Sequence, residues 1–157
     1  MRFVPAANLH VTVQFLGEVA EERAAELEGA LRARVAPLAP FALELERIAP
    51  GPPGGRARMV WAHFARSPDF ERLARAVAEA AAPYAPKLEP PRQALPHATL
   101  ARFGRPPPRL RDLVLPQLAG SVHVPACQLV RSRLSPKGSI YTVLAELPLR
   151  GELSRPA

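Results

Sequence analysis

Two copies of one short pattern constrain this sequence more than any other feature. Each copy reads His-x-Thr within a run that alternates between apolar and polar residues, one near the N-terminus and one past the middle of the chain. Such alternation is typical of a β-strand, in which side chains two positions apart share a face. The pattern therefore predicts that His10 and Thr12 share one face, and that His97 and Thr99 share another. If the two strands lie side by side, a single face carries two imidazoles and two hydroxyls.

Two histidines held in this way can perform acid–base chemistry on a phosphate. Because an imidazole titrates near pH ~6.5, one neutral ring can activate water while a protonated ring supplies a proton to the departing oxygen. The threonine hydroxyls can donate hydrogen bonds to phosphate oxygens, and Arg102 can neutralise the charge of the transition state. Strict alternation sends Arg102 to the face opposite His97, so this role requires a bulge in the strand. The scheme uses no metal ion and no cofactor.

Length and composition narrow the class of protein. A chain of 157 residues has the size of one domain. Its net charge of +7 favours an anionic partner such as nucleic acid, although a general bias toward Ala, Pro and Arg accounts for the charge equally well. The only cysteine, Cys127, excludes an internal disulfide and fits a cytoplasmic location. No apolar run reaches the ~18 residues of a membrane span, and no secretory signal pattern is present.

The order of elements predicts the fold class. We expect strands at residues 8–16, 41–48, 59–64, 97–103, 122–131 and 140–147, and helices at 18–35 and 67–82. Residues 83–96 form a proline-rich connector, and residues 109–118 are either a short helix or a loop. Strands and helices do not alternate regularly, which predicts an α+β fold with antiparallel sheets and outer helices. The repeated His-x-Thr strand suggests a bilobal, pseudo-twofold arrangement around a central cleft.

Three blocks of sequence resemble a known family. Asn8 to Glu18 resembles the first signature of the RNA 2′,3′-cyclic phosphodiesterases, also called 2′-5′ RNA ligases, within the two-histidine phosphoesterase superfamily. Pro96 to Arg102 resembles the second signature, and Ser132 to Tyr141 is similar to the closing stretch. The blocks occur in the family's order, and the resemblance extends over about residues 3–149.

The resemblance implies an activity and a role for each histidine. It implies metal-independent hydrolysis of 2′,3′-cyclic phosphates at RNA ends to 2′-phosphates, with 2′-5′ ligation in vitro by some members. His10 is then the proton donor to the departing oxygen, and His97 is the proton acceptor that activates water. The residues by themselves support the pair but leave the assignment of acid and base open.

Other residues have two interpretations each. Phe15 is a candidate for stacking on a base, although a core position is favoured for it. Arg133 and Tyr141 are candidate substrate contacts, or equally a surface cation and a packed ring on a sheet. Trp61 is interpreted as a core or rim residue, and His63 as a structural or surface histidine. His63 has no cysteine or carboxylate cluster around it, so no zinc site is expected.

The predicted domain covers residues 1–149, with a loose tail at 150–157. Members of the family usually have a strand and a helix before the first signature, and this segment is apparently lacking here. We therefore expect an unpaired sheet edge, or an edge filled by a neighbouring segment. A cytoplasmic monomer is predicted.

The leading functional hypothesis is an enzyme whose partner is RNA with a 2′,3′-cyclic phosphate end. The alternative is a non-catalytic RNA- or nucleotide-binding module on the same scaffold, and a third option is a phosphodiesterase for another cyclic phosphate. The intact His-x-Thr pattern at both positions favours the enzyme.

Overall fold

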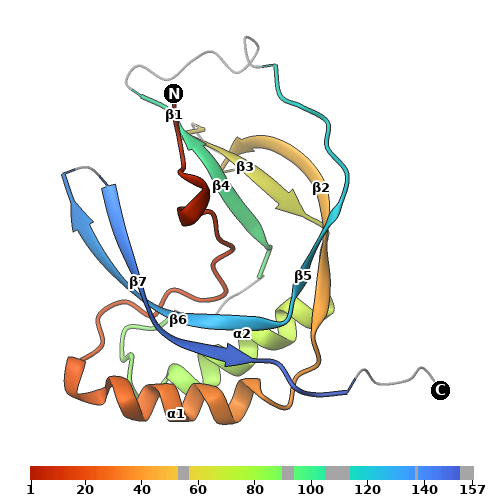
Figure 1. The fold of residues 1–157 in the computed structure, drawn as a ribbon. Helices are drawn as coiled ribbons and strands as arrows, with labels where there is room; N and C mark the ends of the chain where they lie inside the picture. The colour runs from red at the N-terminus through yellow and green to blue at the C-terminus, as the bar shows by residue number, and fades with distance from the viewer. Residues whose placement is uncertain (53–56, 90–93, 105–113, 137, 153–157) are drawn as a thin grey trace. The chain divides into compact units, whose positions relative to one another are not determined.

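The computed structural model describes residues 1–52, 57–89, 94–104, 114–136 and 138–152 (Figure 1). The chain divides into two compact units, each assembled from three separate segments. The first unit comprises residues 1–12, 43–67 and 95–122, and the second comprises residues 13–42, 68–94 and 123–157. The mixture of antiparallel strand pairs with two α-helices confirms the predicted α+β class.

A five-stranded sheet with the order β1-β4-β3-β2-β5 forms the first unit. Its strands are β1 (Arg2–Phe3), β2 (Phe41–Gly51), β3 (Met59–Phe64), β4 (His97–Arg102) and β5 (Ser121–Val124). The pairs β1–β4, β4–β3 and β3–β2 are antiparallel. β2 and β5 run at one end into the second unit. The strand order brings β4, which is distant from β3 in sequence, to a place between β1 and β3.

The alternation of β3 divides the sheet into a buried face and a partly open face. Val60, Ala62 and Phe64 are buried, whereas Met59, Trp61 and His63 between them are only partly covered. This period of two is what a strand requires when only one of its faces is packed against a core. The partly open face is therefore available for chemistry, while the apolar face stabilises the sheet.

Two helices and a long hairpin make up the second unit. The helices are α1 (Ala24–Val35) and α2 (Pro68–Ala81), and the hairpin strands are β6 (Ala126–Ser135) and β7 (Gly138–Pro148). α1 packs against both α2 and β7. Leu27, Leu31 and Val35 recur every four residues and are buried, which gives α1 one apolar stripe for this contact.

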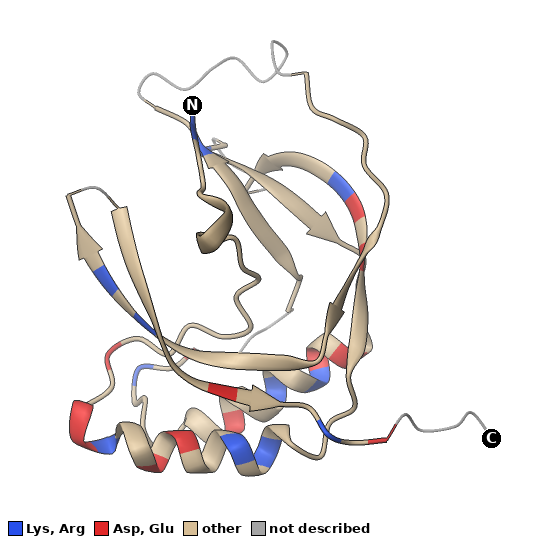
Figure 2. Ribbon diagram, in the orientation of Figure 1, with Lys and Arg blue, Asp and Glu red and all other residues tan. Residues whose placement is uncertain are grey.

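Charged residues follow the dipole of α1. Figure 2 shows acidic positions in red along the first part of the helix and basic positions in blue near its end. Glu26 lies in the first turn, while Arg32 and Arg34 lie in the last. This distribution complements the partial charges of the helix ends. Neither described helix is both long and apolar enough to cross a membrane.

Most of the predicted elements are confirmed, with β3 and α2 close to their predicted limits. The predicted strand at 8–16 is wrong, because only Val11 forms a bridge there, and a 3-10 turn, η1 (Ala6–Asn8), precedes it. The predicted helix at 18–35 starts late, at Ala24, after the 3-10 turn η2 (Glu21–Arg23). No side chain caps that start by a hydrogen bond, which leaves the early turns without the support that a cap provides.

Two further segments differ from expectation or lie outside the described residues. The predicted strand at 122–131 is divided into β5 and β6 at Pro125, which has no N–H to donate to a ladder. Part of the connector, residues 90–93, and part of the ambiguous stretch, residues 109–113, lie outside the described residues. The remaining residues 114–118 form no regular element.

An open sheet always has two edges, so the expectation of an unpaired edge left by a lacking segment stays a prediction. The large sheet ends at β1 and β5, and within the described residues β6 and β7 pair only with each other. Apolar side chains near the tip of this hairpin are exposed, with Leu134 at 90% and Ile140 at 57%.

The beginning of the predicted tail is attached to the second unit. The N–H groups of Arg150 and Gly151 donate to the carbonyl oxygens of Ala36 and Leu38, both at 2.9 Å. Residues 153–157 lie outside the described residues.

Candidate active site

The two His-x-Thr tripeptides pair with each other through their central residues. Val11 forms an antiparallel bridge with Ala98. Antiparallel register then places His10 opposite Thr99 and Thr12 opposite His97. Where the backbone beside this bridge is extended, side chains one residue away from the bridged pair lie on the face opposite Val11 and Ala98, so we expect the four motif side chains to share one face. The two histidines are diagonal neighbours on the pair of strands, a relation with typical Cβ separations of about 7–8 Å.

Each imidazole is held by a hydrogen bond of the same kind, between Nδ1 and a backbone carbonyl oxygen. Nδ1 of His10 lies 2.8 Å from the carbonyl oxygen of Asn8, and Nδ1 of His97 lies 3.0 Å from that of Leu95. A carbonyl oxygen can only accept, so Nδ1 carries the proton in each ring. Nε2 is consequently the atom that offers a lone pair when the ring is neutral and a proton when it is charged. The two rings are equivalent in this respect.

The local sequence explains why these carbonyls are available. Asn8 is the last residue of η1, and the final carbonyls of a helical turn have no partner within it. At the other motif, the buried Pro96 separates Leu95 from His97, and the carbonyl oxygen of Pro96 accepts the N–H of Phe64 at 3.1 Å. That bond fixes the start of β4 against β3. The preceding carbonyl group, that of Leu95, accepts the hydrogen bond from the His97 ring.

A bulge in β4 turns Arg102 to the histidine face. The register between β3 and β4 shifts between Val60 and Trp61, so that Leu100 is the additional residue. Arg102 therefore lies opposite Met59, which shares the partly open face of β3. The guanidinium group approaches the Met59 sulfur, with 3.2 Å between Nη1 and Sδ, and the Arg102 side chain is exposed. The bulge that the sequence analysis required for this residue is present, whereas phosphate binding by Arg102 stays a prediction.

Two aromatic residues of β3 lie beside His97. The indole of Trp61 stacks on the imidazole of His97, with ring centroids 4.0 Å apart and planes inclined by 26°. The register places His63 directly opposite His97, and its ring lies 5.6 Å from the indole. Trp61 is only partly covered, which agrees with its interpretation as a rim residue. Its contact with a motif histidine was not part of that interpretation. No signal in the sequence links these residues, because they meet only through strand pairing.

The environment of His63 disfavours its protonation. Burial lowers the pKa of His63 below 6.5, and the positive charges of Arg47 and His97 lower it further, while Glu46 acts in the opposite direction. Arg47 lies opposite His63 on β2 and forms an ion pair with Glu46 at 2.9 Å. His63 is therefore a neutral ring, with the cationic Arg47 opposite it on one neighbouring strand and the titratable His97 opposite it on the other.

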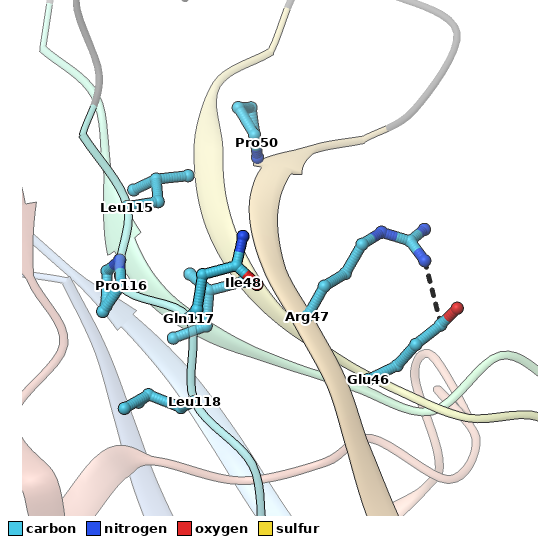
Figure 3. A pocket seen from close by; sticks show the side chains of 8 residues that line it. All are labelled: Glu46, Arg47, Ile48, Pro50, Leu115, Pro116, Gln117 and Leu118. Carbon is cyan, nitrogen blue, oxygen red and sulfur yellow. Dashed lines mark ion pairs between the residues drawn. The ribbon is translucent and has the colours of Figure 1, made fainter.

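A cavity of about 280 Å³ lies elsewhere in the first unit. Residues of β2 and of the segment 115–118 line it (Figure 3). Figure 3 shows Arg47 and Glu46 extending toward each other on one side of β2, while Ile48 lies on the side of Gln117. Neither motif histidine lines this cavity. We therefore locate the chemistry at the paired motifs and not in this cavity.

The remaining candidates belong to the second unit. Phe15 is 75% exposed, so the interpretation as a core residue is wrong, and its proposed base contact stays a prediction. Arg133 and Tyr141 lie on β6 and β7, one register step apart, and both side chains are exposed. Their role in substrate binding also stays a prediction. Among the described residues, no group of three or more His, Cys, Asp or Glu side chains is arranged to hold a metal ion.

Comparisons with known proteins point to one family. The model of the 2′-5′ RNA ligase superfamily matches residues 2–134. An RNA 2′,3′-cyclic phosphodiesterase of Thermus thermophilus is 40% identical, with 97% of this chain and 77% of that protein covered. One from Archaeoglobus fulgidus is 32% identical, with 90% of this chain and 80% of that protein covered.

Solved structures give the same result. The crystal structure of the Thermus thermophilus protein TT0787 superposes with a TM-score of 0.76 at 36% identity, covering 97% of this chain and 84% of that one. The crystal structure of E. coli LigT complexed with 3′-AMP superposes with a TM-score of 0.73 at 29% identity, covering 94% of this chain and 80% of that one.

Proposed function

Because the chain belongs to the 2′-5′ RNA ligase superfamily, we propose that it hydrolyses 2′,3′-cyclic phosphates at RNA ends to 2′-phosphates. The observation that carries the proposal is the antiparallel bridge between Val11 and Ala98. It brings the two motifs together in the first unit, and each imidazole has Nδ1 bonded to a backbone carbonyl oxygen, so that Nε2 is the atom that can take or give a proton. Such a pair can take a proton on one side of a phosphorus atom and supply one on the other.

The reaction adds one water molecule across one P–O bond. Nε2 of His97 accepts a proton from water as the water oxygen attacks phosphorus, and the bond from phosphorus to the 3′ oxygen breaks. Nε2 of His10 gives its proton to that oxygen, which leaves a 3′ hydroxyl and a 2′-phosphate. His97 ends protonated and His10 neutral, and exchange with solvent restores the starting state. Ligation through a 2′-5′ link would use the same two groups in the same direction, with a 5′-hydroxyl attacking phosphorus in place of water.

The neighbouring polar groups stabilise the transition state in this scheme. The hydroxyls of Thr12 and Thr99 lie on the histidine face and can donate to the non-bridging phosphate oxygens. Arg102, brought to the same face by the bulge, can offset the negative charge that accumulates at phosphorus. The assignment of His10 as acid and His97 as base follows the family resemblance, since both rings have Nδ1 bonded to a backbone carbonyl oxygen and this bond does not distinguish them.

A direct test uses an oligonucleotide with a 2′,3′-cyclic phosphate end. Substituting His10→Ala or His97→Ala should lower kcat by about two to four orders of magnitude, because each change removes one proton-transfer group. The rate is measured by separating the cyclic and 2′-phosphate products, with and without EDTA. His123→Ala is the matched control, because His123 is an exposed histidine of β5 outside the paired motifs. Full turnover in either motif variant, or loss of turnover with EDTA, would contradict the mechanism.

The same variants distinguish the alternative, a non-catalytic RNA- or nucleotide-binding module. That module predicts RNA binding that survives both motif substitutions and no 2′-phosphate product from the unmodified protein. The two hydrogen-bonded histidine rings favour the enzyme, because binding alone does not require Nδ1 of both rings to be fixed in the same way.

A further inference from the structure

We propose that Trp61 is a positioning residue for His97, and that its indole fixes the plane of the imidazole from which Nε2 reaches the phosphate. The inference rests on the proposed function for its activity measurements only. The contact itself is a property of the first unit. It joins β3 and β4, which the sheet pairs with Trp61 opposite Thr99, two residues along from His97.

The hydrogen bond to Leu95 does not by itself fix the ring of His97. A single N–H···O bond still allows the imidazole to tilt about its side-chain torsions. Nε2, which lies on the far side of the ring, changes its direction with this tilt. Stacking on the indole removes this freedom, because the two planes lie only 26° apart at a centroid distance of 4.0 Å. The bond fixes one atom of the ring and the stack fixes its plane. Together they define one direction for Nε2, which is the condition for efficient proton transfer.

Gly51 holds the other side of the indole. It lies on β2 opposite Met59, and a Cβ added to it would fall 2.6 Å from Cε3 of Trp61, closer than real Cβ contacts. The indole is therefore layered between the backbone of Gly51 and the imidazole of His97. A glycine is required here by space, because any side chain would displace the ring.

The indole N–H does not explain the position of Trp61. Nε1 is buried and has no hydrogen-bond partner in the described part of the chain. A buried donor without a partner lowers stability. The ring is thus placed for the contacts of its faces, which are the contacts with Gly51 and His97.

The first test combines NMR of the histidine rings with kinetics. In the unmodified protein, ¹⁵N shifts of the His97 ring should show the single neutral tautomer with hydrogen on Nδ1. The bond to Leu95 holds this tautomer, so it should persist in Trp61→Leu. The loss of the aromatic face should instead average the three-bond couplings that report the side-chain rotamer of His97, with kcat lowered roughly 10- to 100-fold and KM changed less than about threefold. Trp61→Phe keeps a flat ring and should restore most of the rotamer preference and of kcat. A single rotamer of His97 together with unchanged kcat in Trp61→Leu would overturn the proposal.

Two further variants separate positioning from stability. Gly51→Ala leaves the tryptophan in place but displaces its ring, so it should reproduce the effect of Trp61→Leu on the rotamer of His97 and on kcat. Phe64→Leu is the matched control, because Phe64 lies on the same strand but on the buried face. It should lower the melting temperature without altering the rotamer of His97 or kcat. An unchanged rotamer in Gly51→Ala would also contradict the proposal.

A third measurement needs no change at the stack. Trp61 is the only tryptophan of the chain, so the intrinsic fluorescence reports on it alone. A protonated imidazole quenches an indole that it contacts, and emission should therefore fall when the solution is acidified. His97→Gln should abolish most of this change and His63→Gln should leave most of it. A titration that survives His97→Gln would refute the stack.

The measurements also separate this inference from the proposed function. If the unmodified protein shows no turnover of cyclic-phosphate RNA, the proposed function fails, while the rotamer and fluorescence results still decide whether Trp61 fixes His97. If turnover is present but neither the rotamer nor the fluorescence depends on the stack, the inference alone fails.

Discussion

At the scale of single residues, backbone carbonyls determine which nitrogen of each histidine does chemistry. Asn8 and Leu95 both stand two residues before the histidine that they hold. Because the acceptor belongs to the backbone, it carries no charge and does not change with pH. A neutral acceptor fixes the tautomer without forming an ion pair that would favour the protonated ring. Either histidine can therefore serve as acid or base.

His63 gives a prediction for stability at the residue scale. Its folded pKa lies below the unfolded value of ~6.5, so below that pH the unfolded chain binds more protons than the folded one. The free energy of unfolding should therefore fall as the pH decreases from about 6.5 toward the folded pKa. His63→Gln removes this contribution and should reduce the difference in unfolding free energy between about pH 7.5 and about pH 5. Urea unfolding at both pH values measures it, and an unchanged difference would count against a desolvated His63.

At the scale of elements, a single bridge and a single bulge assemble the site. The bridge between Val11 and Ala98 is sufficient to align both tripeptides, because a register is defined by one pair. The bulge at Leu100 reverses the alternation of β4, so that Arg102 joins the face of Thr99 instead of the face of Ala101. Two irregularities, an interrupted strand and an additional residue, therefore produce the site. Regular strands would not bring Arg102 to the histidine face.

The stripe of α1 gives a prediction at the element scale. Leu31 is 2% exposed at the centre of this stripe, so Leu31→Ala should lower the free energy of unfolding by about 2–5 kcal/mol through lost burial and an unfilled cavity. The neighbouring Arg32 has an exposed side chain that pairs with Glu28 at 2.7 Å. Arg32→Ala should cost less than about 1 kcal/mol, as is usual for exposed ion pairs. Denaturant unfolding of both variants makes the comparison, and equal losses would show that α1 does not contribute a packed core.

At the scale of the whole molecule, the net charge of +7 acts on a long anionic substrate more than on a short one. RNA binding releases counterions for each phosphate that the protein neutralises, and the affinity then falls as salt rises. A single cyclic nucleotide presents one phosphate, whereas an oligonucleotide presents several. The contribution of the general charge should therefore appear in KM and depend on substrate length.

Salt dependence tests this expectation. Between about 50 mM and about 200 mM salt, KM for a cyclic-phosphate oligonucleotide should rise much more steeply than KM for the corresponding 2′,3′-cyclic mononucleotide. The kcat values of both substrates should change little, because the proton-transfer groups are the same. Initial rates at several salt concentrations provide the measurement. Equal salt slopes for the two substrates would show that the charge of the chain does not serve RNA binding.

The sequence by itself determined the features that repeat along the chain. Strand character predicted β3 at its observed bounds, Met59–Phe64, and a helical pattern predicted α1, although from an earlier start than Ala24. The two His-x-Thr patterns likewise predicted a histidine and a threonine on one face. These properties are local, because side-chain direction follows from the backbone of one strand or one helix.

Which of these local features come into contact depends on the tertiary structure. The pairing of Val11 with Ala98, the bulge beside Trp61 and the layer of Gly51 against the indole each join residues that lie apart in the sequence. No periodicity encodes such contacts, because the order of strands in a sheet and the register between them are set by the packing of the whole unit. The sequence thus supplied the catalytic candidates, and the sheet supplied the neighbours that orient them.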